Sequence, residues 1–380
     1  MALVLSEEQE LLRQTSREFL KQHAPVSELR RLRDAQDPAG FSREVWKQMA
    51  ELGWAGIPFP EELGGAGLGQ LELGIVLEEC GRTLAASPLV STVLVCGSAL
   101  LLGGSQAQRQ DVLPAIAKGE RILALALQEG PRHDPFAVAT RAEPAGAHGF
   151  RLSGEKAFVL DGHVADQLLV VARSEGRPGE REGLSLFLLD RDAKGVSVTR
   201  TLMIDGRNAA RVSLAGVEVP ASALVGEPGR GALVLEPTLD RATAGLAAEL
   251  LGSSQEAFDR TLRFLKTRQQ FGVPIGSFQA LKHRAARLYV ALELARSAVL
   301  EALQALDEGD ARASERASTA KALVGDASLA VANEGVQMHG GIGVTDEEDI
   351  GLFLKRARVA QLSFGDAAFH RDRFASLRGY

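Results

Sequence analysis

Three short segments carry the residues whose types and spacing are suited to chemistry. Arg268 has a planar guanidinium that can hold a phosphate by two parallel hydrogen bonds, although an isolated arginine is more often a solvated surface residue. Gly340 and Gly341 allow a backbone to approach a ligand closely, although a glycine pair is also a common helix terminator. Asp366 carries a carboxylate that could accept a proton, and it also precedes a helical run as an N-cap would.

Composition excludes several classes of function. The net charge of −6 and the pI near 5.8 argue against nucleic acid as a general partner, because phosphate binding needs a basic face. No apolar run is long enough to predict a membrane span, and residues 1–12 do not resemble a signal peptide. Cys80 and Cys96 have no metal-ligand spacing and cannot build a disulfide framework. We therefore expect a cytoplasmic protein without a metal site.

Three zones with different hydrophobic periods must position these residues. Residues 1–120 show helical periodicity, and residues 121–230 contain short Val-, Leu- and Phe-rich segments divided by Gly, Pro and Asp. Residues 231–380 are helical again, with long periodic segments near 234–270, 276–307, 312–338 and 346–378. This order predicts an α+β protein with an N-terminal helical domain, a middle antiparallel β domain and a C-terminal four-helix bundle.

Local signals predict where individual helices begin and where one loop lies. Ser6 and Gln9 have the spacing of a capping box at the start of the first helix. Ser87 is predicted to cap a helix over 88–102, with Pro88 in its first turn. The hydrophilic run 174–182 predicts an exposed hairpin loop between two strands.

The helix–β–helix order and five local segments resemble the acyl-CoA dehydrogenase family over nearly the whole chain. The strongest match is Arg-Gln-Gln-Phe-Gly-x-x-Ile-x-x-Phe-Gln from Arg268 to Gln279. Nearly as strong is Gln-Met-His-Gly-Gly-Ile-Gly-Val-Thr, which begins at Gln337. The other three segments are 58–69, 103–120 and 217–231. Each segment alone is weak, but their joint order is typical of this fold.

The resemblance implies a non-covalent FAD held mainly by the C-terminal helical zone. In the family, the arginine of the Arg-x-x-Phe-Gly motif contacts the FAD pyrophosphate across a subunit interface, and Arg268 matches it. Gln279 resembles a residue near the adenosine side. The residues that the resemblance assigns to FAD are Arg268, Phe271, Phe278, Gln279, Gln337, Met338, His339, Gly340, Gly341, Gln128, Phe158 and Leu160.

The family pattern fails at the catalytic base. Relatives remove a proton from Cα of an acyl-CoA with a glutamate, but the matching position here is Phe364. A minority of members carry the base on an earlier helix, where this chain has Ala242. Asp366 remains as a candidate displaced base, with the helix N-cap as its alternative role. We interpret His370, on the following helix, as a surface residue.

The segments expected near the flavin ring also depart from the family. Gln128-Glu129-Gly130 stands where relatives have Thr-Glu-Pro, and Phe158-Val159-Leu160 replaces Trp-Ile-Thr. The segment 132–134 has lost a serine that contacts CoA in relatives. The motifs for the FAD tail are thus kept while the reacting end is altered, which favours retained FAD binding with changed or lost chemistry.

Three interpretations follow. The chain is an acyl-CoA dehydrogenase with an unusual base, a non-catalytic subunit paired with an active paralogue, or a flavin oxidase or monooxygenase on the same fold. The resemblance further implies an acyl-CoA substrate, an electron-transferring flavoprotein as acceptor, and a dimer or tetramer. Long amphipathic helices across 234–378 also predict an oligomer, since they carry more apolar surface than one bundle core buries.

Overall fold

The computed structural model describes residues 4–146 and 149–380, and these fall into two compact units. The helical unit contains residues 4–31, Gln70–Ala86 and Thr243–Tyr380. The sheet unit contains Leu32–Gly69 and Ser87–Ala242. The predicted domain boundaries near residues 120 and 230 stay predictions.

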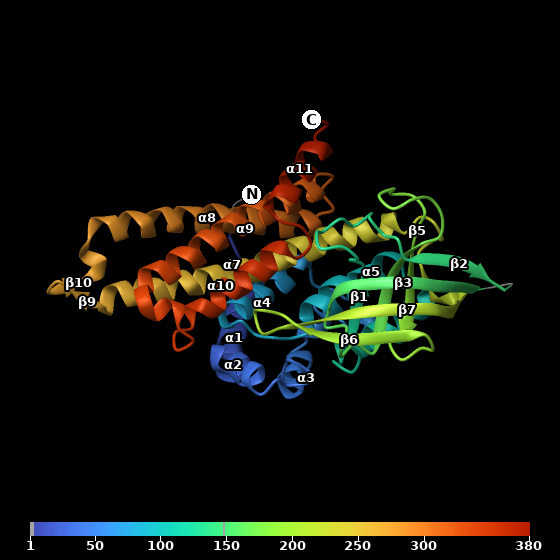
Figure 1. Ribbon diagram of the computed structural model, residues 1–380, viewed down its shortest axis with the longest axis horizontal. Coiled ribbons are helices and arrows are strands. Elements are labelled where there is room, and N and C mark those ends of the chain that lie inside the picture. The colour runs from blue at the N-terminus through green and yellow to red at the C-terminus, as the bar shows by residue number, and fades with distance from the viewer. Residues whose placement is uncertain (1–3, 147–148) are drawn as a thin grey trace. The chain divides into compact units, whose positions relative to one another are not determined.

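The helical unit is built from long helices joined by short connections (Figure 1). Its elements are α1 (Glu7–His23), most of α2 (Val26–Asp34), α4 (Gln70–Thr83), most of α7 (Ala232–Thr267), β9 (Gln269–Gln270), β10 (Val273–Pro274), α8 (Gln279–Asp307), α9 (Ala313–His339), α10 (Ile350–Leu362) and α11 (Ala367–Leu377). Single 3₁₀ turns cover Ile275–Ser277 and Gly340–Val344. The capping box predicted at Ser6 and Gln9 is confirmed.

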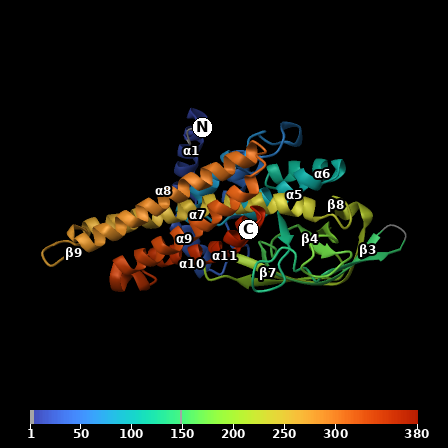
Figure 2. The same cartoon turned by 90° about the horizontal axis from the view of Figure 1, so that it is seen from above.

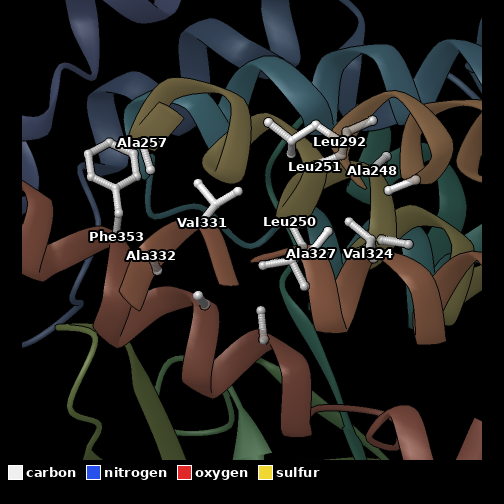
Figure 3. Packing of buried hydrophobic residues seen from close by; sticks show 14 of the residues in the cluster. Ala248, Leu250, Leu251, Ala257, Leu292, Val324, Ala327, Val331, Ala332 and Phe353 are labelled. Carbon is white, nitrogen blue, oxygen red and sulfur yellow. The ribbon is translucent and has the colours of Figure 1, made fainter. Parts of the chain in front are cut away.

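Alanine, leucine and valine from α7, α8, α9 and α10 form the core of the helical unit, as the helical period predicts. Figure 3 shows part of this core, including Leu250 and Leu251 of α7 and Val324 and Ala327 of α9. The fourth long segment, expected over 346–378, is broken into α10 and α11. The break falls at Phe364 and Gly365, whose φ angles of 57° and 102° end a right-handed helix.

The sheet unit combines short helices with one large sheet. Its helices are α3 (Arg43–Glu51), a π-helix over Leu89–Gly97, α5 (Ser98–Gly103) and α6 (Gln106–Ala117), with 3₁₀ turns at Trp54–Gly56, Glu61–Leu63 and Ala221–Ala223. The predicted cap at Ser87 is wrong, because Pro88 is the cap residue and no side chain caps this helix. The strands are β1 (Leu123–Ala126), β2 (Arg141–Ala145), β3 (Gly149–Leu160), β4 (Gln167–Arg173), β5 (Leu184–Asp190), β6 (Val196–Leu202), β7 (Asn208–Pro220) and β8 (Leu224–Val225).

The strands pair in the order β6-β7-β3-β2-β4-β5-β8, with β1 beside β4. Most neighbours are antiparallel, as predicted, but β1 and β4 are parallel from Leu123 opposite Gln167 onward. Alternating burial cannot reveal this direction, because it is the same in both kinds of pair. Residues 175–182 form the predicted exposed loop, and buried Arg173 holds it by donating to the carbonyls of Glu180 and Glu182 at 2.7 and 2.8 Å.

Candidate functional site

The strongest sequence motif folds into a two-stranded hairpin that follows α7. Gln270 pairs with Val273, so Phe271 and Gly272 form a two-residue loop, and both have positive φ, 56° and 79°. Two such residues are the signature of a tight type I′ turn. The turn leaves Phe271 90% exposed, with its ring edge-on to Phe278 at 6.1 Å. Figures 1 and 2 show this hairpin beyond the ends of α7 and α8.

Polar groups of the same motif are exposed beside these rings. Arg268 lies at the base of the hairpin, where its carbonyl accepts from the amide of Ile275 at 2.9 Å. Its side chain is exposed and makes no ion pair with any residue in the described ranges. Gln279 is the exposed first residue of α8. The motif thus leaves a guanidinium, an amide and two aromatic rings exposed.

The second motif lies where α9 ends. Gly340 is the C-cap, with φ 66° and ψ −142°, a conformation open to glycine and costly for other residues. A Cβ added at Gly340 or at Gly341 would meet no heavy atom within 4 Å. Both glycines and Gln337 are exposed, so the backbone here is open to a ligand.

Met338 and His339 point the other way. Met338 belongs to the core of the helical unit, and His339 is buried. The Nδ1–H of His339 donates to the carbonyl of Gly335 at 2.7 Å, and its ring stacks on Phe264 at 4.4 Å. These two assigned residues therefore have only their backbone available to a ligand. The ring stack also joins the C-terminal turns of α7 and α9, which brings the Arg268 motif and the glycine pair to the same end of the helical unit.

The candidate base lies in the turn between α10 and α11. Asp366 is half-buried and is the N-cap of α11, because its Oδ1 accepts from the amide of Phe369 at 2.9 Å. Phe364, which we predicted to stand at the family's glutamate position, is partly buried against the core of the helical unit. The structure thus supports the capping role of Asp366, and its role as a base stays a prediction.

The buried side chains of Lys321 and His370 donate hydrogen bonds to the backbone around this turn. The Lys321 ammonium donates to the carbonyls of Gln361 at 2.8 Å and Gly365 at 2.7 Å. Burial lowers the pKa of Lys321 to about 7, opposed by the negative charge of Asp366. His370 donates from Nε2 to the carbonyl of Phe364 at 3.0 Å. His370 is buried, so its interpretation as a surface residue is wrong.

The sheet unit brings together the residues assigned near the flavin ring. The carbonyl of Gln128 accepts from the amide of Ala157 at 2.7 Å, which places Gln128 next to Phe158. Phe158 lies in a bulge of β3 against β7, with φ 51° and 55% of its surface exposed. A large aromatic residue in a left-handed conformation is rare and is typical of functional sites. Leu160 is half-buried two residues further on.

A buried ion pair fixes this arrangement. The Lys156 ammonium contacts Glu129 Oε1 at 2.6 Å and donates to the carbonyl of Leu127 at 3.2 Å. Burial lowers the pKa of Lys156 to about 8, and Glu129 opposes this shift. Glu129 also accepts from the amides of Ala139 and Thr140 at 2.7 and 3.0 Å. The segment next to Gln128 is therefore anchored to β3 and to the start of β2.

Sequence reasoning missed both buried lysines. In a sequence, Lys156 and Lys321 resemble any solvated lysine, and their partners are backbone carbonyls or a glutamate distant in the chain. Within the described ranges, no group of three or more His, Cys, Asp or Glu side chains is placed to hold a metal ion. Over the same residues, no helix has the length and apolar character needed to cross a bilayer.

Comparison with known proteins identifies the family. The acyl-CoA dehydrogenase N-terminal, middle and C-terminal domain models match residues 6–120, 128–217 and 229–376. The chain is 33% identical over 377 residues to the mitochondrial isovaleryl-CoA dehydrogenase of Pongo abelii, with 97% of this chain and 88% of the relative covered. It is 31% identical over 381 residues to a 3-(aryl)acrylate reductase of Clostridium sporogenes, with 98% and 99% covered. The chain belongs to the acyl-CoA dehydrogenase family.

A solved structure extends the comparison to an assembly. The chain superposes with a TM-score of 0.89 on a chain in the ChsE4–ChsE5 complex of Mycobacterium tuberculosis, at 28% identity, covering 100% of this chain and 99% of the other. FAD is the cofactor of the family. The residues present fit it, because the exposed Arg268 suits a phosphate and the open backbone at Gly340 and Gly341 admits a close ligand.

Proposed function

We propose that the chain is a FAD-dependent oxidoreductase that dehydrogenates an acyl-CoA thioester between Cα and Cβ. FAD, when bound, supplies the acceptor for the hydride that leaves Cβ. The observation that carries the proposal is that Arg268, Phe271 and Phe278 are exposed at the end of the helical unit where Gly340 and Gly341 leave the backbone open. Phe271 and Phe278 are exposed and therefore do not stabilise the core of a monomer. We assign the pair to contact with a cofactor or with a subunit that brings one.

The chain's own residues would bind and orient. Arg268 would hold the pyrophosphate, Gln279 would bind near the adenosine, and the backbone of Gln337 to Gly341 would line the cofactor. Phe158 would stack on the flavin ring, with Gln128 and Leu160 beside it. Asp366 is the carboxylate we propose to test as acceptor of the Cα proton.

A second candidate is a non-catalytic FAD-binding subunit of a heteromeric acyl-CoA dehydrogenase. The observation that favours it is that the Asp366 carboxylate already caps α11. The predicted match of Phe364 to the position of the usual base agrees with it. In this case Arg268 would complete the cofactor site of an active paralogue, and the chain would give no turnover by itself.

Both candidates require an oligomer, which the surface of α8 supports. Tyr289, Val290 and Leu294 are large apolar residues that remain exposed on this helix. Such a stripe is typical of a surface covered by another subunit. We propose a homo-oligomer or an assembly with a paralogous chain, in the cytoplasm, with an electron-transferring flavoprotein as electron acceptor.

The test is a visible absorption spectrum of the purified chain, followed by anaerobic titration with an acyl-CoA panel. Flavin absorbance that bleaches with one acyl-CoA supports the dehydrogenase, whereas bound flavin that never bleaches until a paralogue is added supports the second candidate. A chain that stays colourless with added FAD, with or without a paralogue, contradicts both. Arg268→Ala should weaken FAD binding. Its matched control is Arg211→Ala, which removes an exposed arginine of the sheet unit whose only ion pair within the described residues is a 3.6 Å surface contact.

A further inference from the structure

Two buried side chains from other elements hold the turn between α10 and α11 through its backbone carbonyls. Three carbonyls, those of Gln361, Phe364 and Gly365, accept hydrogen bonds from the side chains of Lys321 and His370. Lys321 comes from α9 and His370 from α11, so two helices converge on one short segment. No side chain of residues 361–365 takes part in these bonds.

Holding the turn in this conformation costs free energy, which indicates that the shape of the turn matters. Phe364 has φ 57° and Gly365 has φ 102°, and a left-handed phenylalanine is strained. Lys321 is fully buried with carbonyls as its hydrogen-bond partners, an arrangement that desolvates a charge. The C-terminal carbonyls of α10 offset part of the cost of burying the Lys321 charge, because they are the negative end of a helix and favour a cation.

His370 is itself held by a second contact. Its Nε2 carries a proton, because it donates to the Phe364 carbonyl, and its Nδ1 lies 3.4 Å from Ser318 Oγ. Ser318 Oγ also accepts from Arg373 at 3.1 Å. The chain Arg373–Ser318–His370 thus orients the donor to the turn.

We propose that Lys321 and His370 are positioning residues that hold the side chain of residue 364 in one orientation, whatever that side chain is. The clamp acts on carbonyls alone, so exchanging the side chain at 364 does not remove any of its bonds. The bonds that hold the turn therefore do not depend on a carboxylate at position 364. In Phe364→Glu, the new carboxylate is expected to take the direction that the Phe364 side chain now takes. This catalytic consequence rests on the proposed function, whereas the clamp itself does not.

The clamp is tested on the FAD-saturated protein with 4-fluorophenylalanine incorporated only at position 364. One narrow ¹⁹F resonance is expected for the parent. Lys321→Met, which keeps the chain length and removes the donor, is expected to split this signal or broaden it at least about two-fold. His370→Phe, which keeps a ring, is expected to act in the same direction if Lys321→Met fails to fold. Lys118→Met removes an exposed lysine of the sheet unit that has no assigned role, and it is expected to leave the signal unchanged. An unaltered resonance in both turn variants overturns the proposal.

A kinetic arm separates this proposal from the proposed function. In Phe364→Glu, an acyl-CoA that reduces the flavin is sought first, and Lys321→Met is then added. We expect the reduction rate to fall more than about ten-fold while the half-saturating acyl-CoA concentration changes less than about two-fold, because the turn and not the binding surface is altered. An equal loss in both parameters contradicts a positioning role. If Phe364→Glu reduces no flavin while the ¹⁹F signal still depends on Lys321, the proposed function fails for this chain and the clamp stands.

Discussion

Asp366→Asn separates the two roles that one carboxylate could have. The Oδ1 of Asp366 accepts the amide of Phe369 at 2.9 Å, and asparagine offers an equivalent oxygen. Because asparagine caps about as well as aspartate, the free energy of unfolding should change by less than about 0.5 kcal/mol. Asp366→Ala removes the cap, and it should destabilise the chain by about 0.5–2 kcal/mol.

A catalytic role would not distinguish asparagine from alanine in this way. If Asp366 accepts the Cα proton, Asp366→Asn and Asp366→Ala should both slow flavin reduction, by roughly 10²–10⁴-fold, since general-base catalysis contributes that much. If Asp366 only caps α11, Asp366→Asn should keep flavin reduction within about ten-fold of the parent. The capped geometry leads us to expect the second outcome.

The assay measures three quantities on each variant: the free energy of unfolding in urea, the FAD content, and the rate of anaerobic flavin reduction by the best acyl-CoA. The FAD content is the control, because a lost cofactor would imitate a lost base. Parent turnover that disappears in Asp366→Asn, at unchanged FAD content and stability, would refute the capping interpretation and identify Asp366 as the base.

Three other predictions follow from the same contacts. Arg268→Ala should weaken FAD binding by about 1.5–3 kcal/mol, or roughly 10- to 150-fold, in a fluorescence titration where Arg211→Ala binds FAD normally. Light scattering at micromolar concentration should find a dimer or larger assembly, and a monodisperse 40.4 kDa monomer would contradict the assignment of the α8 surface. Burial lowers the pKa of Lys321 from 10.5 in the unfolded chain to about 7 in the folded one, so folding releases a proton between these values. The free energy of unfolding should therefore rise with pH across that window, and urea titrations of Lys321→Met should show a flatter rise.

Periodicity was sufficient for much of the fold, and its failures have physical reasons. The helices of 231–380 and the strands β4 and β5 carry continuous apolar patterns, so their existence could be predicted. β2 was not, because Arg141–Ala145 contains a proline and two charged residues and is largely exposed. The break between α10 and α11 was visible only as Gly365 before an N-capping aspartate, since Phe364 has no sequence signal for a left-handed backbone.

The candidate site was predictable where its chemistry lies on the surface. Arg268, Gln279 and the glycine pair are exposed and belong to two recognisable motifs, so the sequence alone could propose them as binding residues, and that role stays a prediction. Met338 and His339 belong to the same motif as the glycine pair, yet they face the core. This could not be predicted, because a motif read along a helix does not separate the inner face of the helix from its outer face.

The least predictable residues are those that act on the backbone. Lys321 lies 44 positions from its acceptor Gly365, and Lys156 lies 27 positions from Glu129, so no local spacing connects either pair. A carbonyl acceptor also places no demand on the residue type that bears it, which leaves no partner pattern to find in the sequence. For the same reason, the proposed Lys321 clamp should accept either phenylalanine or glutamate at position 364. The reacting side chain and the geometry that presents it are therefore separable in this chain, and Phe364→Glu with and without Lys321→Met measures each of them independently.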